Sequence, residues 1–288
     1  MELYILFTLT IIRIAIAGDL HGEWSHTDNE LVHALNPDAI LFVGDLDDGQ
    51  IRIAKIINDL SIPTGIILGN HDKGIDTSGH QLKSQLDLLG DKDCGWGNCS
   101  WENLLISVVG ARPCSAGGGY YLSEQVKSVY GHISIEESVD IIVNASRKLP
   151  SKLPLIILAH SGPTGLGSEV SSLCGRDWKA SSIDWGDKDL ELSIDKIKKE
   201  RSVDLVVFGH MHHELRRGRG IRDTFYIDST RGIAYLNAAC VPRKGIDSNG
   251  TLLTHFSWVE FFNGKLMHAS HRWYRDDFSL AYKEDLLN

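Results

Sequence analysis

The amino-acid sequence predicts an α/β fold, and three observations carry this prediction. Apolar runs rich in Val, Ile and Leu recur along the first two-thirds of the chain. Amphipathic stretches separate these runs, and polar residues follow several of them directly. Continuous apolar runs are typical of strands that are buried on both faces, as α/β architectures require. A hydrophobic content of 42% is enough for a sizeable core and excludes a mainly disordered chain.

Strands and helices are expected to alternate through the first two-thirds of the chain. Strands are predicted at residues 11–17, 38–43, 64–69, 104–110, 153–160 and 203–210, and helices at residues 29–35, 50–60, 134–149 and 187–201. Thr27 or Asp28 could cap the first helix. After His213 the strands become shorter, and Asn263-Gly264 predicts a hairpin within residues 250–276. No repeat or linker is present, so we expect a single domain over residues 1–288.

Two long irregular stretches remain between these elements. They cover residues 94–131, outside the strand at 104–110, and residues 161–186. Loops of this length in a compact domain are commonly functional lids or binding surfaces. The second stretch follows His160 directly and contains Cys174, Arg176, Asp177 and Trp178. We therefore expect residues 161–186 to form an active-site loop.

The cysteines predict a reducing compartment. Cys94, Cys99, Cys114, Cys174 and Cys240 form an odd set in a chain too long to need disulfide staples. We expect reduced thiols in a soluble protein of the cytoplasm or of a plastid-type stroma. The spacing of Cys94 and Cys99 is wider than a zinc knuckle normally uses, and no second pair follows, which argues against a structural zinc site.

The first 17 residues resemble a secretory signal, because an apolar run precedes Ala15-Ile16-Ala17. Three features oppose that interpretation. No Lys or Arg precedes the run, Arg13 interrupts it, and cleavage after Ala17 would delete the strand that carries Asp19. The run is also shorter than the ~20 residues of a membrane span. We expect a buried first strand with an apolar lead-in, and no membrane partner.

The polar residues at the strand ends are Asp, Asn and His, which are residue types that commonly bind metals. They stand in GDLHG, GDLDDG, GNHD, the isolated strand-end histidine and GHMH, and comprise Asp19, His21, Asp45, Asn70, His71, Asp72, His160, His210 and His212. The carboxyl ends of strands are where α/β folds assemble their sites. Mixed imidazole and carboxylate ligands suit Mn, Fe, Zn or Co better than calcium. Residues two apart in an extended chain point the same way, so each Asp-x-His or His-x-His pair can converge on one cluster.

This ordered series, from Gly18 to His212, resembles the motifs of calcineurin-like metallophosphoesterases. The resemblance implies a four-layer α/β/β/α sandwich with two mixed central sheets. It also implies a phosphoric ester hydrolase that uses two divalent transition metal ions, with Mn favoured. Of the seven implied ligands, Asp19, His21 and His212 would hold the first ion and Asn70, His160 and His210 the second, while Asp45 would bridge both.

The resemblance implies catalytic roles for His71 and Asp72. His71 would stabilise the phosphoryl oxygens or protonate the leaving group, and Asp72 would orient His71. Asp47 and Asp48 are expected to be loop or supporting groups. Phosphoprotein phosphatases of the superfamily resemble one another in an Asp-Arg-Gly and a Gly-Asn-His-Glu motif, from which the chain departs at Asp48-Gly49 and Asp72. We therefore expect a small-molecule or nucleotide phosphate mono- or diester as substrate.

Three interpretations stay open at this stage. The first is an esterase for small phosphates, in which one of Arg216, Arg217, Arg219, Arg222, Arg231 and Arg243 could clamp a non-reacting phosphate, although a solvated basic loop explains these arginines equally well. The second is a nuclease, which the net charge of -9 disfavours but which metal ions in an acidic site could permit. The third is a non-catalytic scaffold of the same fold.

Overall fold

Buried apolar strands build two mixed sheets in the computed structural model, which describes residues 10–101, 103–216 and 220–288. The first sheet has the strand order β13 (Leu280–Leu287), β12 (Lys265–Arg275), β11 (Leu252–Phe262), β1 (Ile11–Ala17), β2 (Ala39–Phe42) and β3 (Thr64–Ile66), and β10 (Lys244–Ile246) also pairs with β11. The second has the order β4 (Asn98–Cys99), β5 (Ser107–Gly110), β6 (Leu155–Leu158), β7 (Leu205–Phe208), β9 (Ile233–Asn237) and β8 (Phe225–Asp228).

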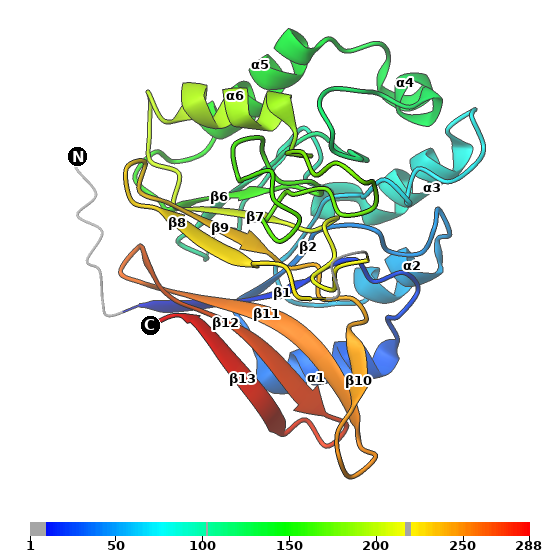
Figure 1. The fold of residues 1–288 in the computed structure, drawn as a ribbon, viewed down its shortest axis with the longest axis vertical. Helices are drawn as coiled ribbons and strands as arrows, with labels where there is room; N and C mark the ends of the chain where they lie inside the picture. The colour runs from blue at the N-terminus through cyan, green and yellow to red at the C-terminus, as the bar shows by residue number, and fades with distance from the viewer. Residues whose placement is uncertain (1–9, 102, 217–219) are drawn as a thin grey trace.

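Helices cover the outer sides of the two sheets (Figure 1). They are α1 (His26–Leu35), α2 (Arg52–Asn58), α3 (His80–Leu89), α4 (Glu124–Tyr130), α5 (Ile135–Arg147) and α6 (Lys188–Ile197), with a short 3-10 helix at Gly90–Lys92. The helices α5 and α6 pack together over the second sheet, and α1 lies beyond the first (Figure 1). The predicted four-layer α/β/β/α arrangement is confirmed. Within the described residues, no helix has the length and apolar character needed to cross a bilayer.

Of the strands that carry the candidate ligands, β1, β2, β6 and β7 lie inside their sheets, and β3 lies at the edge of the first. The strands β1, β2 and β3 are parallel neighbours, as are β5, β6, β7 and β9. All residues of β2, β6 and β7 are buried, which explains their continuous apolar sequences. Parallel strands end at the same edge, so the residues after β1, β2 and β3 meet those after β6 and β7.

Several boundaries and elements differ from the sequence-based expectations. The helix α1 begins at His26 and is capped by Ser25, whose N–H donates to the Asp28 carboxylate, so neither Thr27 nor Asp28 is the cap. The stretch expected to be irregular before residue 131 contains α4, and the helix α3 was not predicted. The hairpin of β11 and β12 turns at Asn263-Gly264, where both residues have positive φ. The apolar lead-in of residues 1–9 lies outside the described residues.

The expectation of five reduced thiols is wrong. Cys94 and Cys99 form a disulfide, while Cys114, Cys174 and Cys240 are buried free thiols. The bridge closes a short loop in which Cys94 N–H also donates to the carbonyl of Ile66, at the end of β3. Disulfides persist in oxidising environments. The bridge contradicts the expectation of reduced thiols, and the compartment stays a prediction.

A buried histidine pair links the two sheets. His255 on β11 and His271 on β12 lie with Nε2 and Nδ1 3.2 Å apart, and Ser257 Oγ lies 3.0 Å from the same Nδ1. The other ring nitrogen of His271 lies 2.9 Å from Thr224 Oγ1, just before β8 of the second sheet. Burial lowers the pKa of both imidazoles, so the pair is neutral and joins the sheets through hydrogen bonds.

Replacing His271 with Asn should reduce the fall in the free energy of unfolding between pH 7.5 and pH 5. Burial lowers the pKa of His271 to about 4, from the usual value of 6.5, so the unfolded chain binds the proton more tightly between these values. The stability contributed by the neutral imidazole is complete above pH 6.5 and falls as the pH drops toward 4, by about 2 kcal/mol at pH 5. Urea unfolding of chelator-treated protein at pH 7.5 and pH 5 measures this loss.

The variant His268→Asn is the matched control, because His268 is exposed on the same strand β12. It should keep the pH dependence of the wild type. If His271→Asn also kept that dependence, His271 would not be the group that acid protonates on unfolding.

Candidate metal centre

Side chains that follow four strands, β1, β2, β6 and β7, form two groups of close ligand atoms at the edge where the sheets meet. Asp19, His21 and His212 form one group, and Asp45, His160 and His210 form the other. Within each group the ligand atoms all lie within 4.8 Å of one another. The two groups contain six of the seven residues that the sequence indicated as ligands, and the seventh, Asn70, lies beside the second group.

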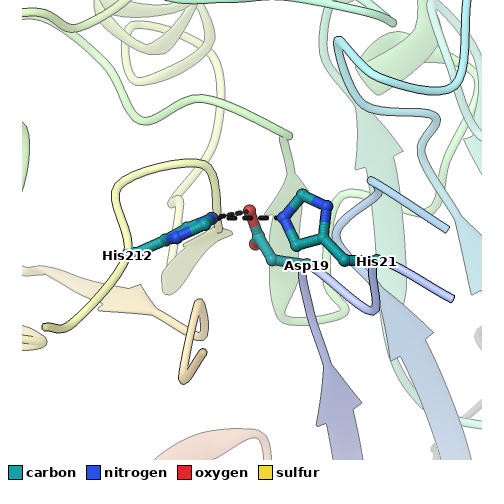
Figure 2. A group of neighbouring side chains, drawn as sticks. All are labelled: Asp19, His21 and His212. Carbon is teal, nitrogen blue, oxygen red and sulfur yellow. Dashed lines mark hydrogen bonds and ion pairs between the residues drawn. The ribbon is translucent and has the colours of Figure 1, made fainter. Parts of the chain in front are cut away.

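In the first group, two imidazoles converge on one carboxylate. His21 and His212 point toward each other beside Asp19 (Figure 2), with their Nε2 atoms 3.2 Å apart. The Nε2 of His212 lies 3.5 Å from Asp19 Oδ1. Burial lowers the pKa of His21, which favours the neutral ring that binds metals. A divalent ion would satisfy both facing nitrogens and the carboxylate.

In the second group, the histidines present their Nε2 atoms to the centre. His160 Nε2 lies 2.9 Å from Asn70 Oδ1 and 3.4 Å from Asp45 Oδ1, while its Nδ1 donates to the Val43 carbonyl over 2.6 Å. Such a backbone partner fixes the tautomer that leaves Nε2 for a metal. His210 Nε2 is buried without a hydrogen-bond partner among the described residues. An orphaned buried nitrogen at this place fits a bound cation.

Asp45 lies between the two groups and faces both. Its Oδ2 lies 3.9 Å from His21 Nε2 of the first group, and its Oδ1 lies 3.4 Å from His160 Nε2 of the second. Burial opposes ionisation of this carboxyl, but His160 and the His71 N–H hold its pKa well below the usual range. An ionised carboxylate with one oxygen toward each group has the position of a bridging ligand.

Protonation differs between the two histidines of the second group. Burial, with help from His160, lowers the pKa of His210 to about 4, so its ring is neutral at physiological pH. Burial also lowers the pKa of His160, but Asp45 raises it to about 10. Metal binding at His160 must therefore release a proton, as it commonly does at histidine sites.

The backbone at the ligands is strained in a way that gathers their side chains. Asp19, His21, Asp45 and His210 all have positive φ, between 43° and 66°. Residues other than glycine rarely adopt this left-handed conformation, and it clusters at functional sites. Sharp turns directly after β1, β2 and β7 therefore direct these side chains back toward the centre.

Two motif glycines permit the close approach of the ligands. A Cβ at Gly209 would lie 2.2 Å from Asp19 Oδ2, and one at Gly69 would lie 2.2 Å from Asp45 Oδ1. Neither carboxylate could stay in place beside such an atom. Glycine therefore precedes His210 and Asn70 because the neighbouring ligand occupies the space of a side chain.

The role expected for Asp72 needs correction. Its buried carboxylate accepts hydrogen bonds from the N–H groups of Leu46 and Gly69, both over 2.7 Å, and so joins the loops after β2 and β3. The partner of His71 is instead Asp48, whose Oδ1 lies 2.8 Å from His71 Nδ1. Asp48, expected only as a loop or supporting group, thus holds the position that the family resemblance gave to Asp72.

His71 and Asp48 lie at the solvent side of the centre. Together with His21 they form a third group of close ligand atoms, but both side chains are exposed and bond each other. With Nδ1 donating to Asp48, the Nε2 of His71 is the nitrogen that can serve a substrate. Asn237, which the sequence reasoning missed, donates to the Met211 carbonyl and so holds the GHMH turn. Its signal was a polar residue at the end of β9.

The two groups lie on the floor of a cleft of about 530 Å³. The walls come from Asp177 and Trp178 of the predicted active-site loop and from Met211, Glu214, Arg216, Arg222 and Val241. A larger hollow of about 720 Å³ lies before β3 and contains no histidine. The chemistry of the lining, rather than the volume, therefore marks the site.

The arginines indicated by the sequence differ in burial and in hydrogen-bond partners. Arg222 is buried and donates to the carbonyls of His212, Ser172 and Gly175, so it supports the loop rather than a phosphate. Arg243 is buried and paired with Asp28, and Arg231 pairs with Asp195. Arg217 and Arg219 lie outside the described residues. Among the described arginines of this set, Arg216 is the one that is exposed and lines the cleft.

The fold and the centre define the class of a metal-dependent hydrolase, and sequence comparison identifies its family. The profile of the calcineurin-like phosphoesterase family matches residues 12–214. The chain belongs to this family. It is a metal-dependent phosphoesterase, a hydrolase of phosphoric ester bonds that binds divalent metal ions. A search of curated protein sequences found no match.

Solved structures with the same fold include named phosphatases. A dimetal phosphatase from Danio rerio is 10% identical with a TM-score of 0.55, over 96% of this chain and 98% of that chain. The purple acid phosphatase PPD1 from yellow lupin seeds is 14% identical with a TM-score of 0.54, over 96% and 54%. The protein TT1561 of Thermus thermophilus is 11% identical with a TM-score of 0.52, over 96% and 99%. At these identities the likeness shows a common fold.

Replacing Gly209 with Ala should weaken metal binding. The added Cβ would lie 2.2 Å from Asp19 Oδ2 and 2.7 Å from Val43 Cγ2, so both the Asp19 carboxylate of the first ligand group and the buried Val43 side chain would have to move. We expect roughly 10–100-fold weaker Mn²⁺ affinity by titration calorimetry. Gly245→Ala is the control, because a Cβ there meets only ordinary contacts of 3.4 Å or more. Equal affinities in the two variants would contradict the role given to Gly209.

Replacing Asp48 with Asn should lower turnover roughly 10–100-fold while metal content stays constant, because Asp48 holds His71 and is not one of the seven candidate ligands. Asp47→Asn, which alters a carboxylate paired with Arg52, should leave turnover near the wild-type value. Steady-state kinetics and elemental analysis of both variants measure this. Loss of an ion from Asp48→Asn would make Asp48 a ligand instead.

Proposed function

We propose that this phosphoesterase hydrolyses a small phosphate mono- or diester, such as a nucleotide, with a hydroxide activated by two divalent ions. One observation carries the proposal: Asp45 turns one oxygen to each ligand group on the floor of the cleft. Asp19, His21 and His212 would hold one ion, Asn70, His160 and His210 the other, and Asp45 both. When bound, two such ions activate a water and hold both ends of an in-line displacement at phosphorus.

His71 would donate a proton or a hydrogen bond to the substrate during the reaction. Its Nδ1 donates to Asp48, so its Nε2 can donate to a phosphoryl oxygen or to the leaving-group oxygen. The Asp48 carboxylate would stabilise the positively charged ring before transfer and keep it oriented. Asp45 would meanwhile be held by the N–H of His71, which couples the position of the acid to that of the bridge.

The shape and charge of the cleft support a small substrate. A volume of about 530 Å³ suits a small organic phosphate or a nucleotide. Of the described arginines in its lining, Arg222 is occupied by backbone carbonyls, and Arg216 is the remaining exposed cation. A nuclease would be expected to present a basic track beside its metals. The cleft favours the small-molecule esterase over a nuclease.

Manganese is the ion we propose, with iron, zinc and cobalt as substitutes. The seven ligands combine four imidazoles with two carboxylates and one amide, and no thiolate is among them. Imidazole and oxygen donors together suit borderline divalent ions. The same mixed set argues against calcium, which takes oxygen ligands only.

Purified protein loaded with Mn²⁺ should release phosphate from aryl phosphates or nucleotides. Asp45→Asn and His71→Asn should each lower kcat by at least about 100-fold, since removing a bridge or a general acid has effects of this size. Asp45→Asn should also reduce the metal content, whereas His71→Asn should retain it.

Elemental analysis and thermal unfolding of both variants accompany the kinetics. Full activity in both variants would overturn the proposed mechanism. Wild-type protein that binds no transition metal would favour a non-catalytic scaffold, and cleavage restricted to nucleic acids would favour a nuclease.

A further inference from the structure

An aromatic side chain forms one wall of the cleft next to the second ligand group. Trp178, from the loop between β6 and α6, lines the same hollow as Asp45, His71 and His210. Its ring centroid lies 6.4 Å from that of His210, with an interplanar angle of 80°. The side chain is half-buried. Part of a large apolar ring thus remains uncovered within reach of the reacting centre.

The position of Trp178 is fixed from behind by a second tryptophan. Trp185 packs edge-on against Trp178, with ring centroids 5.3 Å apart and an interplanar angle of 82°. Trp185 Nε1 donates to the Ala116 carbonyl over 2.8 Å, and the Arg176 guanidinium lies 5.0 Å from its ring. Arg176 is itself buried. The indole of Trp178 therefore packs against a side chain that is itself held by a hydrogen bond and by a cation–π contact.

Arg222 attaches this wall to the metal centre. Its Nη1 donates to the carbonyls of Ser172 and Gly175, both over 2.7 Å, and its Nε donates to the carbonyl of His212 over 3.0 Å. Asp177, the neighbour of Trp178, lies 3.6 Å from Arg222 and accepts the N–H of Arg216 over 2.7 Å. One buried guanidinium thus holds both the loop and the backbone of a metal ligand. These contacts of Arg222 fix the distance between the Trp178 indole and the metal centre.

We propose that Trp178 is a binding subsite for a planar aromatic ring in the substrate, so that the preferred esters carry an aryl group or a nucleobase. This inference rests on the proposed function, since the phosphate must sit at the two ligand groups. An aromatic ring stacks on an indole whatever its substituents, whereas an alkyl chain gains less from the same surface. Preorganisation by Trp185 and Arg222 reduces the entropy lost on binding.

The test compares the effect of the same substitution on an aryl ester and on an alkyl ester of phosphate. Trp178→Leu should raise KM for p-nitrophenyl phosphate about 10-fold, from the energy of one aromatic contact. It should leave KM for glycerol phosphate within about two-fold. Trp178→Phe should restore most of the aryl preference. Tyr282→Leu, at an exposed position on the distant strand β13, is the control and should change neither value. Adenosine monophosphate in the same panel distinguishes a nucleobase from a simple aryl group.

A binding measurement separates this inference from the proposed function. Calorimetry of Mn²⁺-loaded protein should show that phenylphosphonate binds more tightly than methylphosphonate, and that Trp178→Leu removes the difference. This preference without hydrolysis of any ester would support the subsite and overturn the proposed reaction. Equal losses for aryl and alkyl substrates, or no change for either, would overturn the subsite and leave Trp178 as a packing neighbour of His210.

Discussion

The centre depends on one constraint: the Asp45 carboxylate must lie close to candidate ligands from both sheets. Asp45 follows β2 of the first sheet, whereas His160 follows β6 of the second. The two residues meet because His160 Nδ1 donates to the carbonyl of Val43, at the end of the strand that carries Asp45. The buried ionised carboxylate is stable there because imidazole and backbone N–H groups surround it. Any change in sheet packing would separate the two ligand groups.

Supporting interactions hold the loops around this contact. Asp72 joins the loops after β2 and β3 through backbone N–H groups. The buried cation Arg112 binds Asp187 over 2.7 Å and Asp189 over 3.0 Å, and so fixes the end of the loop between β6 and α6. Buried ion pairs of this kind add little net stability but penalise alternative arrangements strongly. Polar contacts behind the walls therefore shape the cleft, and the residues that face it remain available to bind metal ions and substrate.

Much of the fold and most of the centre could be predicted from the sequence, because their determinants are local. A buried strand reads as a continuous apolar run, and a ligand at its carboxyl end stands directly after it, as Asp19 does after β1. The helix α3 escaped prediction because its buried face is partly polar and includes Gln85. The partner of His71 escaped as well. The family resemblance assigned Asp72 to His71, whereas Asp48 lies 23 positions from His71 along the chain and reaches it only through the path of the loop after β2.

The disulfide and the wall of the cleft depend on long-range packing. Spacing alone gave no reason to pair Cys94 with Cys99 rather than leave both reduced, and the choice depends on how the loop after α3 returns to β5. The importance of Trp178 likewise comes from Trp185 and Arg222, which lie 7 and 44 positions further along the chain.

The most direct test of the central claim is to locate the ions. Crystals grown with Mn²⁺ should give two anomalous-scattering peaks per chain, ~3.5–4 Å apart, one on each side of the Asp45 carboxylate. The peak nearer His212 should have Asp19 and His21 as neighbours, and the other should have Asn70, His160 and His210. A single peak at full Mn²⁺ occupancy, or two peaks that do not share Asp45, would contradict the bridging role of Asp45.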